Sequence, residues 1–270
     1  MAELFDNIKK TWNKRVVMTY KKHRFLFEEL VKRDFKRKYK GTMLGMFWSI
    51  LNPLLHLLVM RLVFTQFFGR NTPHYTTYLF TGLLLFDFYR EATTQGMSAI
   101  MSNANIVSKV NVPHYLFLLS KNVSCLINFA LTFCVFLLFC VLDGVRITWS
   151  FFALLYPTCC LIVFNIGVGM ILSSLYVFFR DMSYLYGIFT LLLRYMSAIF
   201  YHVESMSWKV QRLFFLNPVY SYIRYYRIIC LDGGFPSFRL HALCAGYALA
   251  ALLVGVWFYK RNRTRFLYYL

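Results

Sequence analysis

The sequence has few acidic residues: 11 Asp and Glu stand among 270 residues, against 30 Lys and Arg. Only Asp87 and Glu91 lie deep inside a long apolar segment, which is too few carboxylates for a metal site that binds a sugar nucleotide. The motif GxxxxGK[ST] is absent, so the chain has no P-loop to hold the phosphates of ATP. The hydrolytic motifs HExxH and GxSxG are also absent. These absences argue against an enzyme, and we predict no catalytic residue.

Cysteine is present, but not in the spacing of a metal or redox site. The sequence contains no CxxC pair and no Cys/His pattern with zinc spacing. Most of the cysteines fall in apolar segments, where cysteine usually serves as a small packing residue. We therefore predict no metal site. The seven cysteines are Cys125, Cys134, Cys140, Cys159, Cys160, Cys230 and Cys244.

Long apolar segments fill most of the chain, in which 59% of the residues are hydrophobic. A helix needs about 20 apolar residues to cross a membrane. Six segments reach that length, so the sequence predicts an all-α integral membrane protein with six transmembrane helices. They are residues 44–68, 77–101, 116–142, 150–178, 183–203 and 239–259.

Lys and Arg are distributed unevenly among the segments between the spans. The two ends of the chain are densely basic, and the positive-inside rule therefore places both the N- and C-termini in the cytoplasm. A basic chain can also bind nucleic acid, but here the basic residues flank apolar spans, so we expect contact with membrane lipids and no nucleic acid. The predicted domains are a cytoplasmic tail with an interface helix (1–43), the six-span domain (44–259) and a basic cytoplasmic tail (260–270).

A basic, amphipathic run precedes the first span. Phe27, Val31 and Phe35 recur at every fourth position, while Lys and Arg fill the other faces. This pattern predicts an interface helix that lies on the anionic inner leaflet. A simple positively charged flank is the alternative. Residues 1–43 hold no apolar core of the kind found in signal peptides, so we expect no cleaved signal. The interface-helix residues are Phe27, Val31, Arg33, Asp34, Phe35, Arg37 and Lys38.

The predicted spans contain several charged residues. Each costs roughly 2.5–3.5 kcal/mol at a helix centre, so each should face protein or water. Asp87 and Arg90 are three residues apart and can pair on one helix. Arg61 and Arg194 need partners on other helices, or an anionic cargo in a pore; both explanations remain open. Aromatic residues of the fifth span can face lipid or stack on sugar rings. The pore or substrate candidates are Arg61, Asp87, Arg90, Glu91, Arg194, Tyr195 and Tyr201.

Two connections between spans are unusual. Residues 204–238 are too apolar for a simple loop, and the pairs NP and GG interrupt them. We expect two short helices that re-enter the outer leaflet, where non-helical backbone must lie against protein or a water-filled cavity. Residues 102–115 are a short mixed segment on the cytoplasmic side, in which Pro113 suits the first turn of the next helix.

Four stretches in register carry a family resemblance. They are LVKRDFKRKYKGTMLGMFWSILNPLL (30–55), NANIVSKVNVPHYLFLLS (103–120), FFRDMSYL (178–185) and the pair SAIFY (197–201) and LNPVYSYIRYYRIICLDG (216–233). Together the chain resembles the permease subunits of bacterial ABC exporters for lipid-linked polysaccharides, such as O-antigen and teichoic acid exporters. The resemblance covers roughly residues 28–260. Ala198 departs from it, because members of that family usually have Pro there, so the bend of the fifth span is open.

The resemblance implies a homodimer in the bacterial cytoplasmic membrane, with two cytoplasmic ABC ATPase subunits that bind ATP and magnesium, and no cofactor in this chain. It implies that a lipid-linked glycan passes through the permease. The implied ATPase-coupling residues are Asn105, Ile106, Lys109, Pro113, Arg180 and Asp181. The implied outer-gate residues are Asn217, Pro218, Tyr222, Arg224 and Arg227.

Two alternatives remain beside this interpretation. A permease of the same fold could export a small amphiphile or a drug. A membrane-embedded glycosyltransferase or acyltransferase would need a catalytic acid or histidine near an interface. His56 and His202 are the histidines to consider, but the sequence places no second catalytic group beside either one.

Overall fold

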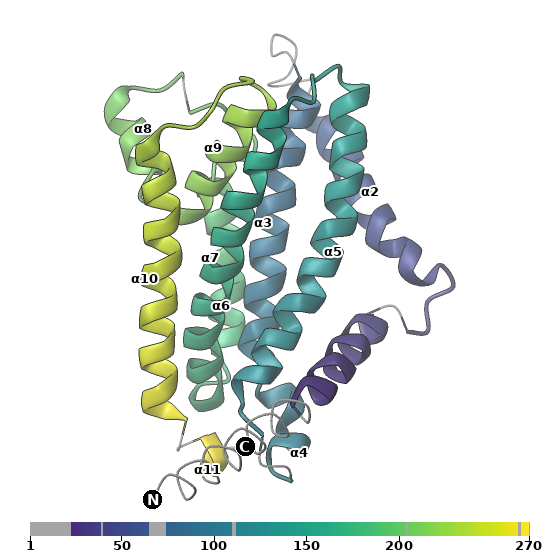
Figure 1. Ribbon diagram of the computed structural model, residues 1–270, viewed down its shortest axis with the longest axis vertical. Helices are drawn as coiled ribbons and strands as arrows, with labels where there is room; N and C mark the ends of the chain where they lie inside the picture. Colours follow the sequence, from purple (N-terminus) through teal and green to yellow (C-terminus); the bar gives the residue numbers. More distant parts are fainter. Residues whose placement is uncertain are drawn as a thin grey trace, which may run out of the picture.

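The computed structural model describes residues 23–38, 40–64, 74–109, 112–203, 205–263 and 266–269, and within these ranges it contains helices and no strand. The predicted all-α fold is confirmed. Long helices run side by side along the long axis of the molecule, and α2 crosses them obliquely (Figure 1). The long helices are α2 (Trp48–Phe64), α3 (Tyr75–Ser98), α5 (Tyr115–Leu142), α6 (Leu155–Phe178), α7 (Met182–Met196) and α10 (Phe238–Asn262).

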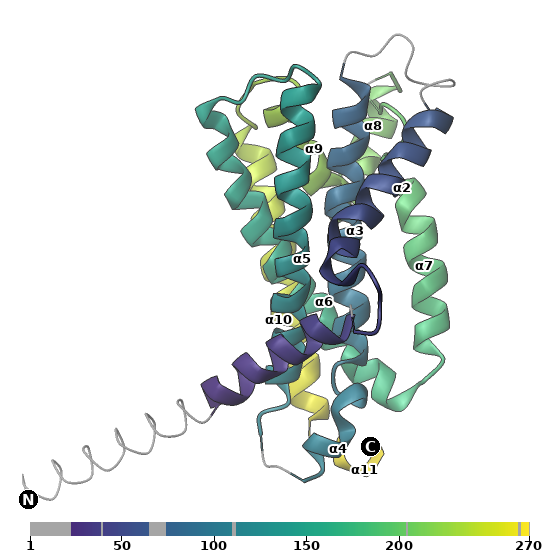
Figure 2. The same ribbon diagram turned by 90° about the vertical axis from the view of Figure 1, so that its right-hand side faces the viewer.

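Short helices connect the long ones, and most of them lie toward the two ends of the bundle. They are η1 (Gly45–Phe47), η3 (Met101–Asn103), α4 (Ala104–Val107), η4 (Trp149–Leu154), α8 (Trp208–Phe214), α9 (Pro218–Cys230) and α11 (Phe266–Tyr269). The helices α8 and α9 lie toward one end, and α4 and α11 lie at the other (Figure 1). Residues 23–38 form an N-terminal helix that lies obliquely across the outside of the bundle, near the α4 end (Figure 2).

In the part of the chain that the structure describes, three helices are long and apolar enough to cross a membrane on length and composition alone: Tyr115–Leu142, Trp149–Phe178 and Phe238–Asn262. These helices identify an integral membrane protein. The other predicted spans are helical too, but α2 has a short apolar part (Trp48–Val59), α3 is charged, and α7 has 15 residues. Residues 65–68 of the first predicted span lie outside the described residues.

The fifth predicted span ends earlier than expected. α7 ends at Met196, so the predicted end at residue 203 is wrong. Ala198 then takes a left-handed backbone conformation, with φ of 49°, and its carbonyl accepts a hydrogen bond of 2.9 Å from Nη1 of Arg227. Proline, the usual residue of the resembling family at this position, cannot adopt this φ because its ring fixes φ near −65°. The chain therefore turns away from the helix at Ala198.

Two short helices, α8 and α9, lie between α7 and α10, as the broken pattern predicted. Asn217 caps α9: its side chain accepts hydrogen bonds from the N–H groups of Val219 (3.0 Å) and Tyr220 (3.4 Å). Pro218 occupies the first turn, where its missing N–H costs nothing. The pair NP that interrupts the apolar pattern is thus the start of a helix.

The core of the bundle is built around α3, which packs against α5, α6 and α9. Most residues of α3 are buried, including small ones such as Thr81 and Gly82. α6 and α10 approach each other closely, because a Cβ added at Gly255 would meet the backbone of Gly167. Glycine at both positions lets these two backbones touch.

Candidate functional site

A cavity of about 740 Å³ opens between α2, α3 and α5. The end of the N-terminal helix contributes Lys38 to its wall, and α7 contributes Arg194. Because α3 carries its charged residues on the side that faces this space, the cavity is polar although it lies among apolar helices. Its charged and strongly polar lining residues include Lys38, Asn52, His56, Asp87, Arg90, Glu91, Gln95, Asn128 and Arg194.

Asp87 is the centre of one charged group in this cavity. Its Oδ1 lies 2.8 Å from Nη2 of Arg194 on α7 and 3.6 Å from Nη2 of Arg90 on α3. Its Oδ2 lies 3.8 Å from Nδ1 of His56 on α2. The predicted pair between Asp87 and Arg90 is confirmed. For Arg194 the sequence left open a partner on another helix or an anionic cargo. The structure provides the partner, Asp87 on α3.

Glu91 is the centre of a second charged group, one residue further along α3. Its Oε1 lies 2.6 Å from Nζ of Lys38 in the N-terminal helix. The same oxygen accepts hydrogen bonds of 3.2 Å from Nε2 of Gln95 and from Nδ2 of Asn128. Lys38, Arg90 and Arg194 outnumber the two carboxylates, so the cavity carries a positive charge that favours an anionic guest.

The structure brings together four of the predicted pore or substrate candidates: Asp87, Arg90, Glu91 and Arg194. Two others, Tyr195 and Tyr201, lie away from the cavity. Tyr195 is exposed, and its carbonyl accepts a 2.7 Å hydrogen bond from the hydroxyl of Tyr201. The side chain of Arg61 lies outside the described part of the structure. Sequence reasoning did not assign Lys38, His56 or Asn128 to this site, because each comes from a different helix and composition does not specify how those helices pack.

The segment that holds α4, with the predicted ATPase-coupling residues Asn105 and Ile106, and the turn between α6 and α7 lie at the same end of the molecule (Figure 2). Asn105 and Lys109 are exposed, whereas Ile106 and Pro113 are partly buried. Arg180 and Asp181 are exposed in the turn between α6 and α7. Residues 110 and 111 lie outside the described residues.

His114 lies between this segment and the C-terminal helix α11. Its ring is 6.1 Å from the ring of Phe266, and burial lowers the pKa of the His114 imidazole below its usual value. The shift arises because burial disfavours the charged form. The contact between α11 and the segment before α5 is therefore made by a neutral ring at neutral pH.

The predicted interface helix packs on the bundle through a face slightly different from the expected one. Leu30 and Asp34 are its most buried residues, at 3% and 6% exposure. The predicted apolar residues Phe27, Val31 and Phe35 beside them are half-buried, while Arg37 and Lys38 are exposed. Asp34 is charged and yet faces the protein. A pattern of apolar residues does not mark such a position, so hydrophobicity alone could not predict which face of the helix is buried.

Two of the predicted outer-gate residues are part of the core of the subunit. Arg227 is 2% exposed; its Nη1 donates to the hydroxyl of Tyr78 (2.7 Å), and its Nη2 donates to the carbonyl of Ile199 (3.1 Å). Tyr222 is fully buried and donates a 3.0 Å hydrogen bond to the carbonyl of Cys244. Arg224 lies nearer the surface, 3.9 Å from Asp232.

Long apolar helices that surround a charged cavity define the class of the molecule: it is a polytopic helical membrane protein. Among the described residues, no group of three or more His, Cys, Asp or Glu side chains could hold a metal ion. The chain belongs to the ABC-2 type transporter family, whose sequence profile matches residues 26–231.

Several curated relatives are similar over most of the chain. An O-antigen export system permease protein of Myxococcus xanthus is 28% identical over 93% of this chain and 98% of its own length. A polysialic acid transport protein of Escherichia coli is 21% identical over 86% of this chain and 92% of its own. A capsule polysaccharide export inner-membrane protein of Neisseria meningitidis is 22% identical over 70% and 73%. These relatives are transport proteins.

Proposed function

We propose that this chain is the channel-forming permease subunit of a bacterial ABC exporter. The exporter moves a lipid-linked polysaccharide, of the O-antigen, teichoic acid or capsule type, across the cytoplasmic membrane. ATP hydrolysis in a separate subunit drives the transport. The observation that carries this proposal is the similarity along 93% of the chain to an O-antigen export permease, together with family membership over residues 26–231.

The proposed topology has six transmembrane helices, with both termini in the cytoplasm. Three of the six need support beyond apolar composition. The charged residues of α3 face a cavity instead of lipid, which is how charged residues are tolerated at membrane depth. In this topology α8 and α9 enter the outer leaflet as gate helices, and the N-terminal helix lies against the inner leaflet near the place where the lipid-linked glycan enters.

The proposed assembly contains two copies of this chain and two ABC ATPase subunits. α4 and the residues around it, including Asn105, Ile106, Lys109 and Pro113, dock into the ATPase, with Arg180 and Asp181 close by. The exposure of Asn105, Lys109 and Arg180 at one end of the molecule supports this arrangement. ATP and magnesium bind to the ATPase subunit, so this chain needs no cofactor.

The cavity between α2, α3 and α5 is the proposed contact with the anionic part of the cargo. Its positively charged residues suit a phosphate or carboxylate group, and its amide side chains suit sugar hydroxyls. The exposed apolar side chains of α7, among them Leu185, Ile188 and Leu192, suit either lipid or the second copy of the chain.

Two alternatives remain. A permease of the same fold could export a small amphiphile or a drug. A membrane-embedded glycosyltransferase or acyltransferase gains one observation: Asp87 lies 3.8 Å from His56, although the sequence suggested no second catalytic group beside this histidine. Arg194 lies closer to Asp87, at 2.8 Å. We therefore interpret Asp87 as the ion-pair partner of Arg194, and not as a catalytic acid or base beside His56.

Deletion of the chromosomal copy in the native bacterium tests the proposal. Surface polysaccharide and intracellular lipid-linked glycan are then measured on gels. The proposal predicts that the polymer disappears from the surface and accumulates inside the cell, and that a plasmid copy restores export. Unchanged surface polysaccharide would contradict it. Loss of the polymer without intracellular accumulation would favour the transferase alternative.

A further inference from the structure

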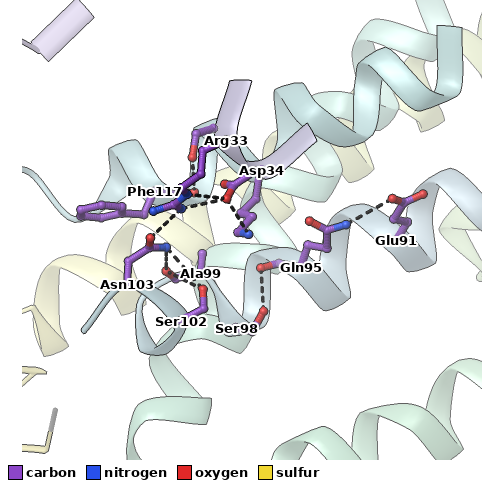
Figure 3. Close-up of polar contacts among 11 residues, drawn as sticks. Arg33, Asp34, Glu91, Gln95, Ser98, Ala99, Ser102, Asn103 and Phe117 are labelled. Atoms are coloured by element: carbon purple, nitrogen blue, oxygen red, sulfur yellow. Dashed lines mark hydrogen bonds and ion pairs between the residues drawn. The ribbon is translucent and has the colours of Figure 1, made fainter. Parts of the chain in front are cut away.

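Asp34 is a buried carboxylate in an otherwise basic helix. Its side chain is 1% exposed, and its Oδ1 lies 3.2 Å from Nζ of Lys121 on α5, which is itself 11% exposed. Oδ1 also accepts a 2.8 Å hydrogen bond from Nη2 of Arg33 (Figure 3). A buried charge that loses its partner is strongly unfavourable. This pair therefore fixes one turn of the N-terminal helix to α5.

Arg33 extends the contact to the segment that contains α4. Its Nη2 donates a 2.7 Å hydrogen bond to Oδ1 of Asn103, and Nδ2 of Asn103 donates a 2.8 Å bond to the carbonyl of Ala99 (Figure 3). Asn103 directly precedes α4. Leu30 adds an apolar contact, because it belongs to one buried cluster with Val107 of α4. The N-terminal helix is thus hydrogen-bonded to the residue before α4, and it shares a buried apolar cluster with α4.

One turn further, the same helix reaches the cavity. Lys38 follows Asp34 by four residues, and residues at this spacing lie on one face of a helix. Nζ of Lys38 lies 2.6 Å from Oε1 of Glu91, and both residues line the cavity. Two successive turns of one helix therefore contact α5 and Asn103 through Asp34 and Arg33, and the cavity wall through Lys38.

We propose that Asp34 is a positioning residue for transport: it fixes the N-terminal helix to α5 through Lys121 and orients Arg33 toward Asn103 beside α4. A displacement of α4 is thereby carried to the pair of Lys38 and Glu91 and opens or closes this end of the cavity. The inference rests on the proposed function, in which α4 is the ATPase contact. The contacts of Asp34 themselves do not depend on that function. In this proposal the N-terminal helix transmits the movement of α4 to the cavity, in addition to its proposed contact with the inner leaflet.

The first test measures hydrogen–deuterium exchange on the purified full-length chain in lipid nanodiscs. The variants are D34N and R33Q, and the matched control is R37Q, which changes an exposed arginine one turn away on the same helix. R33Q keeps the pair of Asp34 and Lys121, so it does not strand a buried charge if D34N fails to fold. We expect amide exchange in residues 101–107 to rise by about tenfold in D34N and R33Q, with no change in R37Q.

The second test uses the deletion strain complemented with each variant, together with its native ATPase. A positioning role predicts that R33Q lowers the amount of polysaccharide exported per ATP hydrolysed by at least about tenfold, while ATPase activity and the amount of assembled complex stay near wild type. A merely structural role would lower export and ATPase activity together. D34E, which keeps the charge, should restore part of the export that D34N loses.

The two tests separate the inference from the proposed function. Equal exchange in residues 101–107 for R33Q and R37Q would overturn the inference, even if deletion of the chain blocks export. A parallel loss of export and ATPase activity would overturn it too. A raised exchange in R33Q without any polysaccharide phenotype on deletion would support the mechanical link and contradict the proposed function.

Discussion

Arg194 and Arg90 contact the same oxygen of Asp87, but their surroundings differ. Arg194 comes from another helix, lies 2.8 Å from Oδ1 and has a side chain that is 20% exposed. Arg90 lies 3.6 Å away on the same helix, and its side chain is 53% exposed. The first arginine therefore joins α7 to α3, whereas the second is available to contact a guest in the cavity.

The substitution R194Q should lower the stability of the folded chain by roughly 1–2 kcal/mol, a value reduced by the partial exposure of Asp87. This corresponds to a fall in Tm of about 3–6 °C in detergent. R90Q is the matched control and should change Tm by less than about 1 °C, because it removes a longer and more exposed contact. Differential scanning fluorimetry of the purified variants measures both values.

Polysaccharide export tests the second role, the contact of Arg90 with a guest in the cavity. If the cavity contacts anionic cargo, R90Q should reduce polysaccharide export while leaving the protein stable. Normal folding and normal export in R90Q, R194Q and R61Q would show that these arginines do not guide cargo. Equal loss of Tm in R90Q and R194Q would contradict the assignment of Arg194 as the helix-joining residue.

At the residue scale, the sequence predicts contacts within one helix and misses contacts between helices. The pair of Asp87 and Arg90 follows from a spacing of three residues. The pair of Asp87 and Arg194 spans 107 residues of sequence and depends on how each helix is rotated about its axis, which composition does not specify. The pair of Asp34 and Lys121 was missed for the same reason, since hydrophobic periodicity does not mark a buried carboxylate.

At the scale of helices, the contact between α6 and α10 depends on two glycines. A Cβ at Gly255 would meet the backbone of Gly167, whereas a Cβ at Gly246, on the same helix, has nothing within 4 Å. Small residues let membrane helices approach closely, so that van der Waals contact holds them together. Alanine substitutions at Gly255 and Gly246 therefore test whether the close approach of α6 and α10 stabilises the fold.

G255A should destabilise the chain by roughly 1–3 kcal/mol, because the backbones of α6 and α10 must move apart to make room for the methyl group. G246A should leave stability unchanged or raise it by up to about 1 kcal/mol, because alanine favours a helix more than glycine does. Thermal unfolding of both variants in the same detergent measures the difference. A G255A protein at least as stable as G246A would show that this close approach is not what holds the two helices together.

Helix positions were predictable where apolar composition changes sharply, and less so where backbone geometry ends a helix. α5 begins and ends within one residue of the predicted span 116–142. The end of α7 was misplaced, because Phe200 and Tyr201 continue the apolar pattern after the chain has turned at Ala198. The turn depends on carbonyls that accept hydrogen bonds from Arg227 in α9, which is a tertiary contact.

At the scale of the whole molecule, the charged cavity and the basic N-terminal helix form one continuous polar region. It runs from Asn103, next to α4, through Asp34 and Lys38 to Glu91 and Asp87. Within the described residues, apolar composition alone identifies three of the expected spans. α3 is not among them because it carries the charged residues of this polar region. The charge that weakens α3 as a predicted span is the same charge that makes the cavity polar.

The measurement that tests the central claim most directly is affinity purification of the intact chain from native membranes in mild detergent, followed by mass spectrometry of the proteins that copurify. We expect an ABC-type ATPase in a one-to-one ratio with this chain, in a complex whose mass fits two copies of each. Repeated purification of an intact chain without any such ATPase would contradict the claim that it is the permease subunit of an ABC exporter.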